Sequence, residues 1–179
     1  MPKSTIAGHP LHPMLVVGPA ALIPFGFALD AMHRSTGKES YANAAYYSLV
    51  GGLVTGLAAG AAGAVDYMSI KPETDVKRTA NTHAMLNVGA LVLTAVNVMN
   101  RRNAPEHQGG SVALSAVAAA AVMISGWFGG RLVYEQGMRV EGVSPIDPTP
   151  ELKAPGDDAM HHFFLGQEER VPARGPYMN

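Results

Sequence analysis

Four stretches of the chain contain no Asp, Glu, Lys or Arg, and each is long enough to cross a lipid bilayer. They span residues 10–29, 41–65, 79–100 and 108–130. The hydrocarbon core of a bilayer is about 30 Å thick, which an apolar helix of roughly 20 residues crosses. A soluble protein of this length would carry charges every few positions along amphipathic helices. The pattern therefore predicts an all-α fold, a bundle of four transmembrane helices joined by short loops.

The last part of the chain has a different composition. Residues 144–179 are rich in proline and acidic residues, and such a segment cannot bury enough apolar surface to fold alone. We therefore expect a four-helix membrane domain at 1–143 and an extended tail at 144–179. The tail is either disordered or an arm that docks on a partner. Residues 1–10 lack the charged and apolar regions of a signal peptide, so no cleavage is expected.

Glycines in the second stretch indicate close helix packing. Gly52, Gly56 and Gly60 recur every four residues, and small residues at this spacing let two helix backbones approach closely. We expect this face to pack inside the monomer, with self-association as the alternative. In the first stretch, Pro19 and Pro24 are expected to kink the helix.

Polar residues form a stripe along each of the last two stretches. They are His83, Asn87, Thr94 and Asn97 in the third stretch, and Ser111, Ser115 and Ser125 in the fourth. Polar groups in lipid must turn inward and find partners. Both stripes are therefore expected to face the bundle interior and to form hydrogen bonds with each other.

Composition excludes several classes of protein. The chain has no cysteine, which rules out disulfides, thiolate catalysis and cysteine-ligated metal centres. A net charge of −1 and an aromatic content of 7% give no basis for nucleic-acid binding. No nucleophile-elbow, phosphate-loop or zinc-protease motif is present. Nothing indicates a hydrolase, and whether the protein is an enzyme stays open.

An even number of membrane crossings places both chain termini on one side. The same side receives the start of the first and third stretches and the end of the second and fourth. The polar side chains at these four ends are His9, His12, Asp66, His83, Arg131, Tyr134 and Glu135. Ionisable groups at a membrane edge are functional candidates by default, so this end of the bundle is the predicted site.

Three alternatives follow from these residues. His12 and His83, with His9 as the alternative to His12, could ligate a b-type haem from different helices. The three histidines and Asp66 could instead hold a transition metal, since cysteine-free histidine sites suit zinc, copper, nickel or iron, or form a proton-linked site. The remaining alternative is structural, with Asp66 and Arg131 as an ion pair and the histidines as helix caps.

The spacing also predicts the surroundings of this site. His9 and His12 are three residues apart, which places both rings on one side of a predicted helical turn. Arg131, Tyr134 and Asn87 are expected to contact and support the ligands.

A second, weaker grouping lies at the opposite end of the predicted bundle. It consists of Asp30, His33 and His107. Loop residues there are expected to be solvated, with a second haem site as the alternative.

Several motifs, in order, resemble a known family. They read HPLHPMLVVGPAALIPFGFALD, GLAAGAAGAVDY, RTANTHAMLNV and SGWFGGRLVYEQGMRV, within residues 9–143. The chain resembles the prokaryotic membrane family called domain of unknown function 2231. The resemblance implies an integral membrane protein with four helices, and fusions of family members to Rieske-type ferredoxin domains imply a link to electron transfer. The residues matched by the family pattern are His9, His12, Asp30, Asp66, His83 and Arg131, and the resemblance assigns them no roles.

We therefore expect a multi-pass protein of the bacterial inner membrane. Its predicted function is that of a haem- or metal-dependent redox component, and the alternative is an accessory subunit of a larger membrane complex. The expected partners are membrane lipid and either other subunits of a complex or a redox partner. Lysine and arginine are more frequent beside the predicted site than at the opposite end, which favours cytoplasmic termini.

Overall fold

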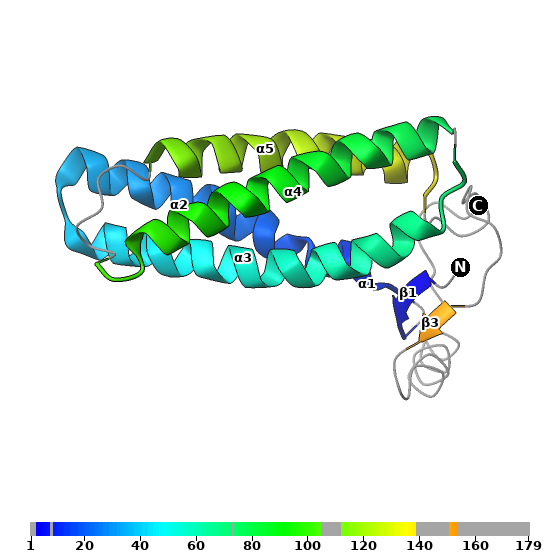
Figure 1. Cartoon of the computed structure of the whole chain (residues 1–179), viewed down its shortest axis with the longest axis horizontal. Helices are drawn as coiled ribbons and strands as arrows, with labels where there is room; N and C mark the ends of the chain where they lie inside the picture. The colour runs from blue at the N-terminus through cyan, green and yellow to red at the C-terminus, as the bar shows by residue number, and fades with distance from the viewer. Residues whose placement is uncertain (1–2, 8, 73, 105–111, 139–150, 154–179) are drawn as a thin grey trace, which may run out of the picture.

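Four long helices lie side by side in a bundle (Figure 1). A computed structural model describes residues 3–7, 9–72, 74–104, 112–138 and 151–153. The helices are α2 (Val17–Thr36), α3 (Glu39–Met68), α4 (Asp75–Arg101) and α5 (Val112–Gly130), with a short α1 (Leu11–Leu15) before α2 and a π-helical turn η1 (Arg131–Glu135) after α5. Each of the four resulting spans is long and apolar enough to cross a membrane. The predicted all-α bundle of transmembrane helices is confirmed.

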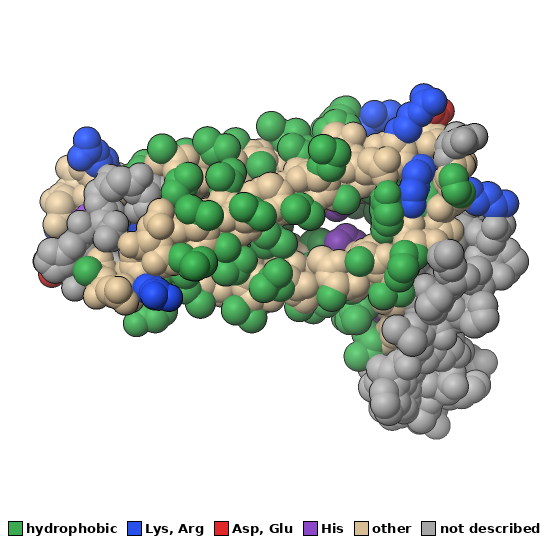
Figure 2. Space-filling model, viewed as in Figure 1, with side chains coloured by type: hydrophobic (Ala, Val, Ile, Leu, Met, Phe, Trp, Pro, Cys, Tyr) green, Lys and Arg blue, Asp and Glu red, His purple; other side chains and the backbone are tan. Residues whose placement is uncertain are grey.

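Small residues fill the interior of the bundle, and large apolar residues cover its outside. The buried core is mostly alanine, with a few larger side chains such as Ile23 and Leu49. Val17, Phe25 and Val54 are among the large hydrophobic residues that are exposed. Figure 2 shows hydrophobic side chains along the sides of the bundle and lysines and arginines at its two ends. This distribution suits a membrane protein, because lipid solvates the outer face while small residues let the helices approach closely.

The glycines of α3 make the predicted close packing at two positions. A Cβ atom added at Gly52 would lie 2.7 Å from Ile23 Cγ1, and one added at Gly56 would lie 2.5 Å from Leu91 Cδ2. Both distances are too short for a real Cβ atom. Helix α3 therefore needs glycine at these positions to pack against α2 and α4.

The prediction is wrong at Gly60, which is exposed and has no atom within 4 Å of its Cβ position. A four-residue repeat drifts by about 40° per step around a helix with 3.6 residues per turn. The packed face of α3 therefore continues through Ala59, which is buried, and Gly63, which contacts His12.

The prolines interrupt the first membrane span at a helix break. Pro13 lies in the first turn of α1 and Pro19 in the first turn of α2, where a missing N–H leaves no helical hydrogen bond unmade. The two helices meet at Val16, and Pro24 lies inside α2. Helical hydrogen bonds continue on both sides of this point, from Val16 N to the His12 carbonyl and from Ala20 N to the Val16 carbonyl, so the prolines interrupt the span only locally.

Both polar stripes face the interior, as the sequence predicts. Thr94 and Asn97 on α4 and Ser115 and Ser125 on α5 are buried. Thr94 satisfies its hydroxyl within its own helix, because Oγ1 donates to the Ala90 carbonyl at 2.7 Å. Ser111 lies outside the described residues.

A small sheet, which the sequence analysis did not anticipate, adjoins one end of the bundle (Figure 1). Strand β1 (Lys3–Ile6) pairs antiparallel with β2 (His9–Pro10) and parallel with β3 (Glu151–Lys153). The predicted helical turn holding both His9 and His12 is therefore wrong. His9 precedes a proline, and such a residue is pushed into extended backbone. Strand β3 belongs to the predicted tail, and the rest of the tail lies outside the described residues.

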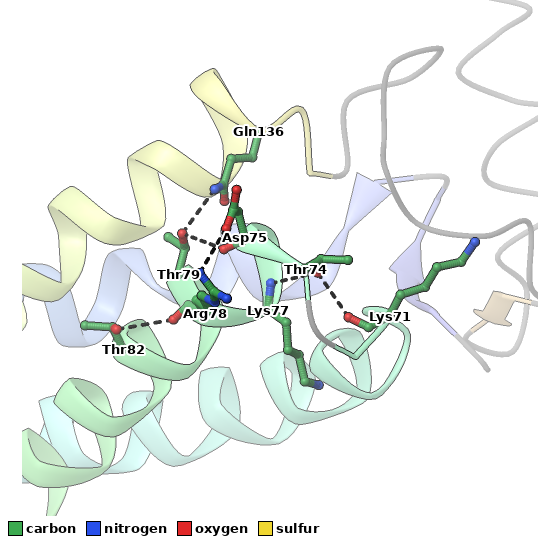
Figure 3. Close-up of polar contacts among 8 residues, drawn as sticks. All are labelled: Lys71, Thr74, Asp75, Lys77, Arg78, Thr79, Thr82 and Gln136. Atoms are coloured by element: carbon green, nitrogen blue, oxygen red, sulfur yellow. Dashed lines mark hydrogen bonds and ion pairs between the residues drawn. The ribbon is translucent and has the colours of Figure 1, made fainter.

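The connection between α3 and α4 lies at the same end (Figure 3). Thr74 caps α4, since its Oγ1 accepts from the Lys77 N–H at 3.1 Å and donates to the Lys71 carbonyl at 3.0 Å. Gln136, which follows η1, donates from Nε2 to Thr79 Oγ1 at 3.1 Å. The start of α4 is thereby joined to the segment after α5, which fixes the two helices relative to each other at this end.

Candidate functional site

His12 and His83 lie close together inside the bundle although 71 residues separate them in the chain. Their ring centroids are 6.1 Å apart, and the ring planes are nearly perpendicular at 87°. His12 is on α1 and His83 is on α4. Figure 2 shows histidine side chains at the edge of a hollow between α3 and α4. The topology predicted from the sequence placed these two residues at the same level, and the structure brings their rings side by side.

The His12 ring lies against α3. Its Nδ1 is 2.8 Å from the carbonyl oxygen of Ala59. A Cβ atom added at Gly63 would lie 2.8 Å from the same nitrogen, which is closer than real contacts allow. Glycine at this position therefore makes room for the imidazole, and the Ala59 carbonyl, one turn earlier on the helix, sets the orientation of the ring.

The His83 ring is held mainly by contacts to α5. Its Nδ1 lies 2.9 Å from the Ser125 carbonyl oxygen and 2.9 Å from Ser125 Oγ. The amide nitrogen of Asn87 lies 3.1 Å from His83 Nε2 and donates to Ser125 Oγ at 2.6 Å. A Cβ atom added at Gly129 would lie 3.1 Å from the ring. These contacts join the polar stripes of α4 and α5 around the imidazole.

The hydrogen bonds define the tautomer of both rings. A carbonyl oxygen can only accept, so Nδ1 of each neutral imidazole carries the proton and donates it. The lone pair of each ring is then on Nε2. In His83 this nitrogen accepts from Asn87. In His12 it makes no hydrogen bond with the part of the chain that the structure describes.

The metal site predicted from four side chains is not assembled. Within the described residues, no group of three or more histidine, aspartate or glutamate side chains is placed to hold a metal ion. His9 is exposed on β2. Asp66 is buried, and its Oδ1 accepts from Ser4 N at 3.1 Å and from Ser4 Oγ at 3.0 Å. The structure therefore pairs two histidines and directs Asp66 to a different partner.

Arg131 and Tyr134 do not support the histidines in the predicted way. Arg131 Nε donates to Glu135 Oε2 at 2.7 Å, four residues further on, and its guanidinium carbon lies 5.2 Å from the Trp127 ring centre. The predicted ion pair between Arg131 and Asp66 is replaced by this local pair. Tyr134 is 88% exposed. A π-helical turn carries both side chains to the outer surface of η1.

The opposite end of the bundle holds a buried ion pair that the sequence analysis missed. Arg101 Nη1 donates to Asp30 Oδ1 at 2.6 Å, and both side chains are buried. Arg101 was expected outside the membrane, and Asp30 was grouped with His33. The available signal was the position of both residues at the same end of their predicted spans. His33 instead contacts the Lys38 carbonyl near the surface, and His107 lies outside the described residues.

Comparison with known proteins places the chain in a family. No curated protein and no solved structure matches it. Residues 8–142 match the family described as "Predicted membrane protein (DUF2231)". The match includes all four membrane spans and both paired histidines. The chain therefore belongs to the DUF2231 family of membrane proteins.

Proposed function

We propose that this protein holds a b-type haem between His12 and His83 and takes part in electron transfer in the membrane. The observation that supports this function is the pairing of two imidazoles from different helices, each anchored through Nδ1 to a backbone carbonyl. Such an anchor fixes the tautomer and leaves Nε2 for ligation, which is the usual arrangement of a ligating histidine.

The number of ligands favours haem over a discrete metal ion. A zinc site takes at least three protein ligands, whereas the described residues contain no cluster of three. Haem iron needs only one or two ligands from the protein, and histidine is a common choice. The ring centroids of His12 and His83 lie 6.1 Å apart, a separation that one ion at about 2 Å from a nitrogen of each ring could bridge.

The surroundings of the rings also favour a flat ligand. Gly63 and Gly129 accommodate the histidine rings themselves, because an added Cβ atom would lie 2.8 Å from His12 and 3.1 Å from His83. Gly60, close to Gly63 on α3, has no atom within 4 Å of its Cβ position. The hollow between α3 and α4 in Figure 2 lies beside the histidines. A macrocycle of mostly apolar surface suits such a position in a bundle whose outer face is in lipid.

The residues of the chain would bind and orient this group. A bound haem supplies reversible one-electron chemistry at its iron. The Ala59 and Ser125 carbonyls accept from Nδ1 of the two rings, which orients each ring and leaves Nε2 as the nitrogen that could ligate iron. Ligation through His83 Nε2 would take the place of its hydrogen bond from Asn87. Both histidines are partly buried among the small residues of the bundle, and burial is one of the means by which proteins set haem potentials.

The same proposal includes a membrane and an orientation. We place the protein in the bacterial inner membrane with the histidine end of the bundle toward the cytoplasm. Lys71, Lys77 and Arg78 lie in or next to the connection at this end. The opposite end has Arg34, Lys38 and Arg102 at its surface, one fewer than the histidine end with Arg131 included, because Arg101 is enclosed in the bundle by its ion pair. Positive charges close to membrane ends favour the cytoplasmic side.

The test of haem binding uses the purified protein and its histidine variants. The wild-type protein is expected to show a Soret band, either as isolated or after titration with hemin in detergent. His12→Ala and His83→Ala are each expected to lose the spectrum of a two-imidazole haem. His33→Ala is the matched control, because His33 contacts the Lys38 carbonyl outside the pair and its removal should leave the spectrum unchanged.

Two results would contradict the proposal. One is a folded wild-type protein that takes up no haem at any hemin concentration. The other is a pair of alanine variants that titrate like the wild type. Either result would favour the alternative, in which the bundle is an accessory subunit without chemistry of its own.

A further inference from the structure

His12 lies on the short helix α1, at the start of the first membrane span. Helix α1 has five residues and continues into α2 through helical hydrogen bonds, from Val16 N to the His12 carbonyl at 3.1 Å and from Ala20 N to the Val16 carbonyl at 3.0 Å. Contacts with α3 and with the strands before α1 hold this N-terminal end of the span, where His12 lies.

One face of α3 supplies the contacts. The Ala59 carbonyl accepts from His12 Nδ1 at 2.8 Å, and the Ala62 carbonyl accepts from Ser4 Oγ at 3.2 Å. One turn further on, Asp66 Oδ1 accepts two hydrogen bonds from Ser4, at 3.1 Å from N and 3.0 Å from Oγ. Positions 59, 62 and 66 share one face of a helix. The N-terminal segment is thus attached to α3 at two places, through His12 and through Ser4.

Strands β1 and β2 connect the attachment at Ser4 to the attachment at His12. Ser4 lies in β1, and β1 pairs with β2 through Thr5 with Pro10 and Ile6 with His9. Strand β2 ends at Pro10, directly before α1 begins at Leu11. The position of Ser4 therefore determines where α1 starts and how far His12 can move from α3.

Asp66 has no favourable role within its own helix. It lies in the last turn of α3, where the helix dipole is unfavourable for a negative charge. It is only 4% exposed, and burial of a carboxylate carries a further cost. Hydrogen bonds from Ser4 offset these costs, since bonds to a charged group are stronger than those between neutral groups.

We infer that Asp66 is a positioning residue, which fastens the N-terminal strand through Ser4 and thereby holds His12 beside His83. This role replaces the one expected from the sequence, in which Asp66 was a metal ligand. The inference rests on the proposed function only where it concerns His12 as a haem ligand. The attachment itself concerns the protein chain alone.

The first measurement follows the His12 ring without any cofactor. Nitrogen NMR of the full-length protein with isotope-labelled histidine should show a protected Nδ1–H for His12 and for His83, each assigned by its alanine variant. Asp66→Ala is expected to make exchange of the His12 proton about tenfold faster or more, because the variant loses two hydrogen bonds to a charged acceptor. The His83 proton, bonded to Ser125, should not change and serves as the internal control.

Conservative and control variants distinguish the positioning of His12 by Asp66 from a general loss of folded structure. Asp66→Asn keeps an oxygen at the accepting position and should restore protection of the His12 proton. Asp75→Ala removes an exposed carboxylate on α4 and should have no effect. Ser4→Ala removes the hydroxyl bonds from the other side, so it provides the test if Asp66→Ala fails to fold. An unchanged His12 signal in a folded Asp66→Ala or Ser4→Ala protein would overturn the inference.

The second measurement uses haem-loaded protein. Asp66→Ala is expected to convert a two-imidazole spectrum to a one-imidazole spectrum, while Asp66→Asn keeps the original spectrum. A two-imidazole spectrum that persists in Asp66→Ala would contradict the inference. If the wild type binds no haem, the proposed function fails, and the NMR result still decides the role of Asp66.

Discussion

Arg101 and Asp30 form a two-point ion pair inside the bundle. Nη1 lies 2.6 Å from Oδ1 and Nη2 lies 3.4 Å from Oδ2. The side chains are 1% and 2% exposed. Arg101 is the last residue of α4 and Asp30 is near the end of α2, so the pair joins two helices at the end opposite to His12 and His83. A lone charge at membrane depth is expensive, which makes each residue dependent on the other.

This dependence predicts a non-additive effect of substitutions. Asp30→Leu or Arg101→Met alone leaves one buried charge without its partner and is expected to cost about 3–5 kcal/mol of folding stability. The double variant leaves two apolar side chains and should recover most of that loss. Unfolding in mixed detergent measures the three proteins, and Arg102→Met, at the exposed next position, is the control. Additive losses in the double variant would show that the pair itself has little energetic importance.

The number of helices and the identity of the inward-facing residues could be predicted from the sequence, because both follow from the avoidance of lipid by polar groups. Charge-free spans of sufficient length leave few alternatives to membrane helices. The inward orientation of Thr94 and Ser115 follows because polar groups avoid lipid. The shared level of His12 and His83 follows from the even number of crossings. These features depend on composition and periodicity, which the sequence contains.

Other features depend on contacts between segments far apart in the chain. The pairing of Ser4 with Asp66 spans 62 residues and involves a backbone N–H, for which no sequence pattern exists. The strand at His9 had a local signal, the proline that follows it. Tyr134 points outward because a π-helical turn follows Gly130. The wider turn changes which side chains after α5 face the bundle.

The close contact at Gly56 gives a prediction with an internal control. Gly56→Leu places a side chain where even a Cβ atom would lie 2.5 Å from Leu91 Cδ2. Overpacking of this kind typically costs about 1–3 kcal/mol. At Gly60 on the same helix, the Cβ position has no atom within 4 Å and is exposed, so Gly60→Leu should leave unfolding in detergent nearly unchanged. Equal effects of the two substitutions would contradict the assignment of Gly56 to the packed face.

The topology can be tested with single cysteines, since the natural chain has none. Lys71→Cys and Glu135→Cys lie at the histidine end of the bundle, and Lys38→Cys and Asn103→Cys lie at the opposite end. In intact cells, a membrane-impermeant thiol reagent is expected to label the second pair only, because the proposed orientation places the histidine end in the cytoplasm. Labelling of the first pair only would reverse the proposed orientation. Any division that separates Lys71 from Glu135 would contradict the four-span topology.

Substitution of Asn87 tests whether His83 has a structural role or ligates haem. Its amide donates to Ser125 Oγ at 2.6 Å and lies 3.1 Å from His83 Nε2, so Asn87→Ala should lower the stability of haem-free protein. The loss is expected to be about 0.6 kcal/mol, the average for one interhelical hydrogen bond in membrane proteins, because only the bond to Ser125 joins two helices.

Asn87→Ala should not weaken haem binding, although it lowers the stability of the haem-free protein. Under the proposed function, iron bound at His83 Nε2 would displace the Asn87 hydrogen bond, so removing the amide would lower the cost of ligation. Hemin titration of Asn87→Ala should therefore show affinity equal to or higher than that of the wild type. Asn81→Ala is the control, because Asn81 is exposed on the same helix and accepts from the Tyr67 hydroxyl. The prediction is contradicted if the Asn87→Ala protein loses haem while its haem-free stability stays unchanged. Asn87 would then support the bound ligand directly, and iron would not displace its hydrogen bond to His83.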